Sequence, residues 1–223
     1  MIKLVAFDWN GTLLSDTWAA LKSDNIALKE MGFKPISRKT FTQAFDIPIK
    51  NYWNNIGMGK DFFETHMVKI EKLFQKNYEK FADKTRSRAG SKEVLKWLKQ
   101  NNITAMIYSN HTTTNIIRQL NRLGIAEYID TVLARPDHDV SHLHARGKAE
   151  KLYAFVKKNK FKPKEVVSVG DTEEEIEIGK HQGFHTVAIT GGYNNTARLK
   201  KHRPDFLIHN MLELKKIIKK LNN

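Results

Sequence analysis

Short apolar runs alternate with amphipathic segments along most of the chain. The apolar runs, which are typical of buried strands, cover residues 2–7, 103–108, 131–134, 165–169, 185–189 and 205–208. Segments with helical spacing lie between or after them, at residues 91–101, 113–123, 148–159, 173–182 and 211–221. Strand–helix–strand repeats of this kind predict a parallel, Rossmann-like sheet with right-handed crossovers, in a three-layer α/β sandwich.

One long segment after the first strand breaks this alternation. Between residues 16 and 83 no strand is indicated, and helical spacing is found at 18–31, 38–45 and 62–81. We therefore predict an inserted α-helical cap formed by residues 15–84, and an α/β core formed by residues 1–14 and 85–223. Gly57 and Gly59, in the middle of this insert, and the segment 84–90 are the predicted hinge and linker points.

Composition narrows the class of protein. Cysteine is absent, which excludes disulfides, thiolate metal ligands and cysteine nucleophiles, and favours a cytoplasmic protein. No window approaches the roughly 20 apolar residues of a transmembrane helix, so no membrane association is expected. The 38 Lys and Arg residues exceed the 24 Asp and Glu residues and give a net charge of +14, which favours an anionic substrate or partner. The oligomeric state stays open.

A group of polar residues directly follows the first predicted strand. Asp8, Asn10, Gly11 and Thr12 belong to the sequence DWNGT, and open parallel sheets bind their ligands at this end of a strand. A carboxylate followed by a glycine, which permits a tight turn, and by a small hydroxyl suits a nucleophile that must approach a phosphate closely.

Polar residues also follow the second and fourth strands. Ser109 and Asn110 could hold phosphate oxygens through a hydroxyl and through backbone N–H groups at a helix start. Asp171 would place a second carboxylate beside Asp8, and two carboxylates without soft ligands favour Mg²⁺. Lys148 begins the helix before the fourth strand, where it could offset the charge of the nucleophile and the phosphate.

Together these motifs resemble those of the haloacid dehalogenase-like hydrolase superfamily, in particular its phosphoglycolate phosphatase-like group with a helical cap. In that family an Asp-x-Asp-Gly-Thr loop carries the nucleophile, and a Ser or Thr ends the second strand. A Lys precedes the fourth strand, and a Gly-Asp-(Ser/Thr)-x-x-Asp motif binds Mg²⁺. The stretches DWNGT, YSN, RGK and GDTEEE stand here in that order, and GGY and RPDFLI resemble the group's last strands.

The resemblance implies a Mg²⁺-dependent hydrolase of a small phosphorylated metabolite, acting through an aspartyl phosphate on Asp8. The implied metal ligands are Asp8, Asp171 and the backbone carbonyl of Asn10, with Glu175 acting through a hydrogen bond or a metal-bound water. The implied phosphate-binding residues are Gly11, Thr12, Ser109, Asn110 and Lys148.

Asn10 departs from the family pattern, which has Asp at this position. That Asp protonates the leaving group and then activates the water that hydrolyses the aspartyl phosphate, and an amide can do neither. Because general acid–base help contributes about 10²- to 10⁴-fold, a phosphatase with Asn10 should be slow unless another group substitutes. The candidate substitutes are His111 and the loop residues Asp137, His138, Asp139, His142 and His144. As a metal site, that loop matches no recognised spacing.

Two other functions stay open. A phosphonoacetaldehyde hydrolase-like enzyme also has a non-acidic residue two after its nucleophile, and forms a Schiff base on a cap lysine, for which Lys50 is the candidate. A non-catalytic descendant that binds a phosphorylated ligand or nucleic acid would account for the basic C-terminal region. Its lysines fit the solvated face of an amphipathic helix without neighbouring aromatics, so nucleic acid is not the expected partner. These lysines are Lys215, Lys216, Lys219 and Lys220.

Overall fold

The computed structural model describes residues 1–137, 139–144 and 147–223. Within these residues the core is a six-stranded, wholly parallel sheet with the strand order β3-β2-β1-β4-β5-β6. The strands are β1 (Leu4–Phe7), β2 (Thr104–Thr112), β3 (Thr131–Arg135), β4 (Val166–Gly170), β5 (His185–Ile189) and β6 (Phe206–Ile208). The predicted fold class is confirmed.

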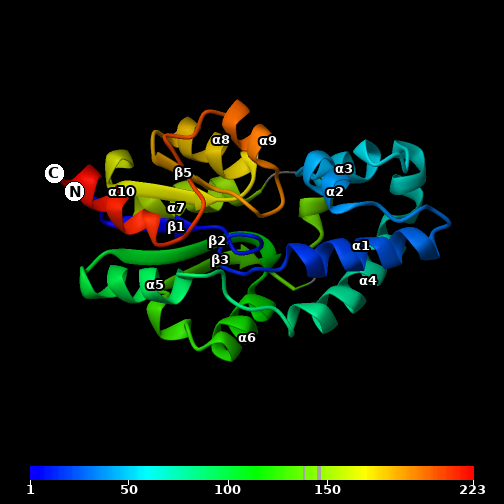
Figure 1. Cartoon of the computed structure of the whole chain (residues 1–223), viewed down its shortest axis with the longest axis horizontal. Helices are drawn as coiled ribbons and strands as arrows, with labels where there is room; N and C mark the ends of the chain where they lie inside the picture. Colours follow the sequence, from blue (N-terminus) through cyan, green and yellow to red (C-terminus); the bar gives the residue numbers. More distant parts are fainter. Residues whose placement is uncertain (138, 145–146) are drawn as a thin grey trace.

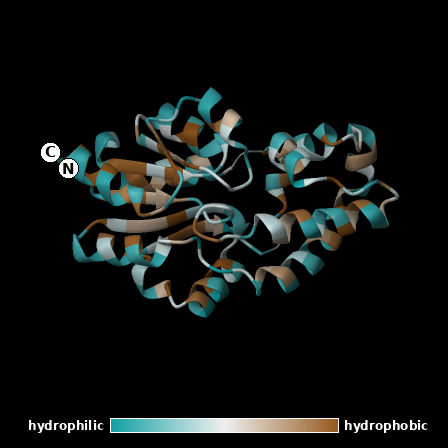
Figure 2. Cartoon of the chain, in the orientation of Figure 1, coloured by the Kyte–Doolittle hydropathy of each residue, from teal (hydrophilic) through white to brown (hydrophobic). Residues whose placement is uncertain are grey.

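Helices cover both faces of the sheet (Figure 1). One face carries α5 (Ser91–Gln100), α6 (Thr113–Leu123) and α10 (Glu213–Asn222), and the other carries α7 (Lys148–Lys158), α8 (Glu173–Gln182) and α9 (Thr196–Lys201). Along β1, Val5 and Phe7 pack toward the first set, and Leu4 and Ala6 pack toward the second. Because both faces of such a strand are buried, β1 is apolar throughout, and Figure 2 shows hydrophobic residues gathered along the strands.

The cap lies at the end of the molecule opposite the chain termini (Figure 1). It consists of α1 (Thr17–Glu30), α2 (Arg38–Ala44), α3 (Ile49–Asn55) and α4 (Lys60–Ala82). These helices bury a hydrophobic cluster of their own, which includes Phe41, Trp53, Phe63 and Ile70. The helical character predicted for this insert is therefore confirmed, whereas its exact boundaries stay a prediction.

The chain enters and leaves the cap through two adjacent segments. The backbone N–H of Ser15 donates to the carbonyl of Arg86 at 2.9 Å, and the N–H of Arg88 donates to the carbonyl of Leu13 at 2.8 Å. Both connections therefore pass through one point beside the sheet.

The structure differs from the sequence-based expectation in two respects. β2 continues to Thr112 with a register shift after Tyr108, so Ser109 and Asn110 lie in its irregular end rather than beyond it. The short helices α3 and α9 are not predicted, because six or seven residues show too little of the 3.6-residue period. Gly57 and Gly59 lie between α3 and α4, in the middle of the insert, where the sequence places them.

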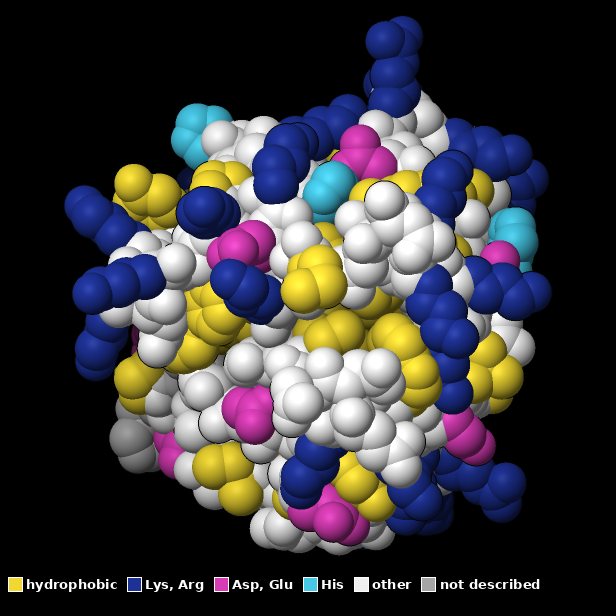
Figure 3. Space-filling model, turned by 90° about the vertical axis from the view of Figure 1, so that its left-hand side faces the viewer, with side chains coloured by type: hydrophobic (Ala, Val, Ile, Leu, Met, Phe, Trp, Pro, Cys, Tyr) yellow, Lys and Arg dark blue, Asp and Glu magenta, His cyan; other side chains and the backbone are white. Residues whose placement is uncertain are grey.

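The surplus basic residues are spread over the surface. α10 buries Leu214 and Ile218, while Lys216, Lys219 and Lys220 are exposed, as its amphipathic pattern predicts. Figure 3 shows Lys and Arg side chains distributed around the end that carries the termini, with acidic and apolar side chains between them. In the described part of the chain, no helix is long and apolar enough to cross a membrane.

Candidate active site

Asp8 follows the central strand β1 and faces Lys148, the first residue of α7. The Lys148 Nζ lies 3.2 Å from Asp8 Oδ1 and 3.0 Å from Glu174 Oε2, and it also donates to Glu175 Oε1. All four side chains are buried. They meet because β4 pairs with β1. The helix before β4 in the chain, α7, begins at the carboxyl end of β1, and so does the helix after it, α8.

This cluster holds more negative than positive charge. Burial raises the pKa of the Asp8 carboxyl well above its ordinary range; Lys148 opposes this shift, and Glu175 and Asp171 reinforce it. Burial alone would lower the pKa of Lys148, but the carboxylates of Asp8, Glu174 and Glu175 raise it well above its ordinary value. Burial and Glu175 together raise the pKa of Asp171 to about 7. An additional cation would relieve this excess of negative charge.

The DWNGT turn packs directly against Asp171. Asp171 Oδ1 accepts a hydrogen bond from Thr12 Oγ1 at 2.6 Å, and Oδ2 accepts one from the backbone N–H of Tyr193 at 2.6 Å. Gly11 has a φ of +73°, and a Cβ there would overlap the Asp171 carboxylate, so glycine is required at this position. The Thr12 hydroxyl thus contacts Asp171, whereas the sequence suggests a contact to phosphoryl oxygens.

Ser109 and Asn110 lie at the same end of the site, at the irregular end of β2. Asn110 Nδ2 donates to Glu174 Oε2 at 3.0 Å, and Ser109 Oγ accepts from the backbone N–H of His111 at 3.2 Å. Glu174 is absent from the sequence-based set of site residues. Its place in a run of three glutamates is typical of a helix N-terminus, and only the fold shows that it reaches Lys148.

Glu175 is anchored at the start of α8. Its Oε2 accepts a hydrogen bond from the backbone N–H of Thr172 at 3.0 Å, which forms a capping box with the Thr172 side chain. Glu175 therefore stabilises the helix start with one oxygen and contacts Lys148 with the other.

The donor set is suited to a hard divalent cation. Asp8 and Asp171 supply carboxylate oxygens. Lys148 is the single lysine among the described residues that line the adjacent cavity, so one lysine faces several carboxylates there. Mg²⁺ prefers oxygen ligands and keeps several waters. No group of three His, Asp or Glu side chains in the described residues is arranged to hold a metal, so a cation here would rely on two carboxylates, a backbone carbonyl and waters.

Asn10 belongs to a buried hydrogen-bond network between core and cap. Its Nδ2 donates to Asp16 Oδ2 and to the Tyr78 hydroxyl, both at 2.7 Å. The hydroxyls of Tyr78 and Tyr193 donate to the same Asp16 oxygen at 2.6 and 2.8 Å. Burial raises the pKa of Asp16, although the hydrogen bonds that it accepts from Tyr78, Asn10 and Tyr193 lower it. The Asn10 amide therefore donates to the Asp16 carboxyl. A carboxylate at position 10 would repel that group instead.

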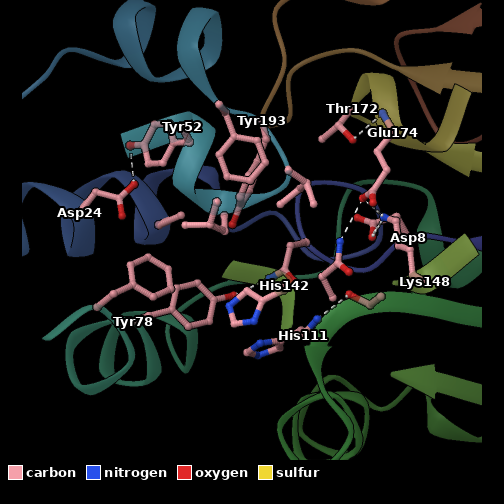
Figure 4. Close-up of a pocket in the computed structure, with 18 of the residues that line it drawn as sticks. Asp8, Asp24, Tyr52, Tyr78, His111, His142, Lys148, Thr172, Glu174 and Tyr193 are labelled. Carbon is pink, nitrogen blue, oxygen red and sulfur yellow. Dashed lines mark hydrogen bonds and ion pairs between the residues drawn. The ribbon is translucent and has the colours of Figure 1, made fainter. Parts of the chain in front are cut away.

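A cavity of about 120 Å³ extends from Asp8 into the cap (Figure 4). Apart from the polar groups already described, its wall is largely aromatic: it includes Phe41, Phe45, Tyr52, Trp53, Phe74, Tyr78 and Tyr193. Ile49 of α3 also lines the cavity, whereas its neighbour Lys50 is not among the described lining residues.

Two histidines proposed as proton carriers lie on the cavity wall. His111 is neutral, because burial and the nearby Arg135 lower its pKa to about 3. His142 Nε2 lies 3.5 Å from Glu71 Oε1 of the cap, and an Arg135 nitrogen lies 3.6 Å from the same oxygen. Both histidines are thus near the site, but neither contacts Asp8 directly.

The other members of the Asp- and His-rich loop diverge. Asp137 accepts a hydrogen bond from the first turn of α6 at 2.6 Å, and Asp139 accepts one from a backbone N–H of its own loop at 2.7 Å. His144 Nε2 lies 3.2 Å from the sulfur of Met67. His138 lies outside the described residues. The described members therefore do not form one metal-binding cluster.

The arrangement of these motifs on a parallel sheet matches that of a known family. The family model of haloacid dehalogenase-like hydrolases matches residues 5–189, which include Asp8, Ser109, Lys148 and Asp171. The chain belongs to this family. The resemblance deduced from the sequence is confirmed: the chain is a haloacid dehalogenase-like hydrolase, and several of its relatives are named phosphatases.

Named relatives of this hydrolase span its whole length. A phosphoglycolate phosphatase of Vibrio vulnificus is 25% identical over 223 residues, covering 97% of this chain and 96% of the relative. A protein of Clostridium perfringens, provisionally named pyrophosphatase PpaX, is 25% identical over 224 residues and covers 100% of both chains. A haloacid dehalogenase-like family hydrolase from Streptococcus pneumoniae has a similar structure, with a TM-score of 0.81, 19% identity, and coverage of 97% of this chain and 98% of that chain.

Asp24 of α1 lies at the cap end of the hydrolase's cavity and is not among the sequence-based candidates. The Tyr52 hydroxyl donates to its Oδ2 at 2.7 Å. Burial raises the pKa of Asp24 to about 8; the bond from Tyr52 lowers it, and Glu71 adds to the rise. A single buried carboxyl among the apolar residues of a helix leaves no periodic pattern, so the sequence does not reveal Asp24 as a site residue.

We expect Asp24→Asn to stabilise the protein increasingly as the pH rises from 5 to 8. In this window the folded state retains the Asp24 proton, since burial raises the pKa from 3.8 to about 8, while the unfolded state has lost it. The contribution of Asp24 to wild-type stability therefore falls with rising pH. Asn cannot lose a proton, so the variant does not suffer this loss. At ~1.4 kcal/mol per pKa unit, the gain in unfolding free energy should be about 2–4 kcal/mol larger at pH 8 than at pH 5.

Urea unfolding at pH 5, 6, 7 and 8 measures this effect. Asp61→Asn, which removes an exposed carboxyl from the first turn of α4, is the matched control and should show no such trend. A gain that is equal at pH 5 and pH 8 would contradict the raised pKa of Asp24.

Proposed function

We propose that this hydrolase releases phosphate from a small phosphorylated metabolite by Mg²⁺-dependent attack of Asp8 on phosphorus. The attack breaks the ester bond, forms an aspartyl phosphate and expels the alcohol; water then cleaves the aspartyl phosphate. The observation that supports this best is the buried contact of 3.2 Å between Asp8 and Lys148 at the carboxyl end of β1, where the cavity begins. The names of the phosphatase relatives agree with this chemistry.

The neighbouring residues would bind and orient the phosphoryl group. Lys148, held in its charged form by three carboxylates, would attract the phosphoryl oxygens and orient Asp8. Ser109, Asn110 and the backbone at Gly11 would complete the phosphate-binding set. Thr12 would act mainly by orienting Asp171, to which its hydroxyl donates.

The residues that would hold Mg²⁺ are Asp8, Asp171 and the Asn10 carbonyl, with Glu175 acting through a hydrogen bond or a bound water. When bound, the ion would supply positive charge for the phosphoryl oxygens and for the buried carboxylates. This role agrees with the raised pKa values of Asp8 and Asp171, which reflect burial and neighbouring carboxylates.

Asn10 sets the limit of this chemistry, because its amide has no proton to transfer at neutral pH. Its Nδ2 donates to Asp16 and Tyr78, so the side chain orients the core–cap network. His111 is neutral and does not contact Asp8. We therefore propose that the preferred substrates carry a leaving group that departs with little protonation, such as a phenol or a second phosphate.

We expect a steep dependence of the rate on the leaving group. With Mg²⁺ present, kcat/KM for 4-nitrophenyl phosphate should exceed that for a simple alkyl phosphate by at least about 10²-fold, because only the alkyl ester needs a proton donor. Phosphate release from a panel of aryl phosphates, alkyl phosphates and pyrophosphate measures this, and EDTA should abolish release.

Equal rates for aryl and alkyl esters would show that another group supplies the proton. No Mg²⁺-dependent release from any ester would contradict the phosphatase proposal and favour a non-catalytic phospholigand-binding protein. Borohydride trapping of phosphonoacetaldehyde on Lys50 tests the Schiff-base alternative, which the described cavity lining does not favour.

A further inference from the structure

The cap end of the cavity contains two carboxyl groups with different surroundings. The Glu71 carboxyl has polar partners: Arg135 and His142 lie 3.6 and 3.5 Å from its Oε1. These contacts lower the pKa of Glu71 despite its burial. Asp24, which is 3% exposed, accepts a hydrogen bond from Tyr52 and forms no ion pair with any described Lys, Arg or His. Asp24 is thus a buried carboxyl group that has no cationic partner in the described structure and keeps its proton until a cation binds.

The walls between Asp24 and the phosphate end are aromatic. Figure 4 shows Asp24 and Tyr52 at one end, Asp8 and Lys148 at the other, and the rings of Tyr78 and Tyr193 between them. Phe41, which is fully buried, packs edge-on against Tyr52 and Tyr193 with ring centroids 5.7 and 5.3 Å apart. Such a wall favours an apolar, ring-bearing body and strengthens any charge pair at its end, because water is excluded.

Given the phosphatase function proposed above, on which this inference rests, we propose a substrate class for the site. The preferred substrates are phosphate monoesters whose alcohol portion is an apolar, ring-bearing body ending in a primary ammonium group. The phosphate binds beside Lys148, the ring packs against Tyr78 and Tyr193, and the ammonium group pairs with Asp24.

Charge complementarity favours an ammonium group over the alternatives. A leaving group that ends in a carboxylate, such as glycolate, would bring a negative charge beside the Asp24 carboxyl and near Glu71, and Arg135 is already engaged by Glu71. An uncharged alkyl end would leave the Asp24 carboxyl buried without a strong partner. The raised pKa of Asp24, about 8, is the shift that burial without a cation produces, and a bound ammonium would reverse it. The nearby aromatic faces also attract a cation.

The test compares two esters of nearly equal shape, 4-(2-aminoethyl)phenyl phosphate and 4-propylphenyl phosphate. Their binding to Asp8→Asn protein is measured by calorimetry with Mg²⁺ present, so that no turnover is needed. We expect the amine ester to bind at least about 10-fold more tightly, the usual worth of a hydrogen bond to a charged group. Adding Asp24→Asn should remove this preference, whereas adding Asp61→Asn, which removes an exposed cap carboxyl, should retain it.

Each outcome decides the inference. Equal binding of the two esters, weaker binding of the amine ester, or a preference that survives Asp24→Asn overturns it, and so does failure of both esters to bind. Hydrolysis by the wild type is read separately with 4-nitrophenyl phosphate. An active phosphatase without an Asp24-dependent preference thus refutes the substrate class alone, and selective binding without any hydrolysis refutes the phosphatase proposal.

Discussion

Replacing Asp8 by Asn should lower kcat/KM for 4-nitrophenyl phosphate by at least about 10³-fold, because an amide cannot attack phosphorus and the remaining groups only bind and orient. Asn has nearly the same shape as Asp, and Lys148 would keep its contacts with Glu174 and Glu175. The fold should therefore persist, and circular dichroism with urea unfolding is the control. Activity within tenfold of the wild type would mean that another group is the nucleophile.

The same variant tests the covalent intermediate. With Asn10 unable to activate water, cleavage of the aspartyl phosphate should be the slow step, so the wild type should accumulate phosphoenzyme in a burst. Rapid acid quenching followed by mass spectrometry should locate the phosphate on the peptide that contains Asp8, and Asp8→Asn should show none. A wild type that turns over without any burst would contradict a slow second step.

Replacing Asn10 by Asp should raise the steady-state rate by about 10²-fold or more and reduce the burst, since a carboxyl at this position can exchange protons with both the alcohol and the water. The variant should also be less stable. Asn10 Nδ2 donates to the buried Asp16 carboxylate at 2.7 Å, and a carboxylate in its place would oppose Asp16 instead. Losing a hydrogen bond to a charged group costs about 1.5–3 kcal/mol of unfolding free energy.

The double variant Asn10→Asp/Asp16→Asn separates the two effects. Exchanging the two side chains restores one donor facing one acceptor, so it should recover stability relative to Asn10→Asp alone, and a double-mutant cycle of unfolding free energies measures the coupling. Additive losses in that cycle would show that the 2.7 Å contact contributes nothing. An Asn10→Asp protein that gains activity while the wild type shows none would indicate a non-catalytic natural protein.

Much of the core could be predicted because its signals are local. The β1 run from Leu4 to Phe7 is apolar on both sides, as burial on both faces requires, and helix α6 begins and ends where the spacing indicates. α3 escaped prediction because it has seven residues, starts after Pro48 and has no side-chain cap.

The candidate site divides in the same way. Asp8, Lys148 and Asp171 follow or precede predicted strands, so the parallel sheet alone brings them together. Asp16 and Tyr193, by contrast, are 177 positions apart, and no local pattern indicates that the Tyr193 hydroxyl donates to the Asp16 carboxyl. The same holds for Asp24, whose importance depends on which helices enclose it.

The two hydrogen-bonded connections at Ser15–Arg86 and Leu13–Arg88 make the insert a separable unit of the chain. Because the insert enters and leaves at one point, the entire insert could be exchanged for another without disturbing strand pairing in the sheet. Grafting residues 15–84 of this chain onto a relative's sheet should therefore carry over the choice of alcohol while the host retains its own phosphate chemistry. Substrate preference would then be set by the insert, and the type of reaction by the sheet.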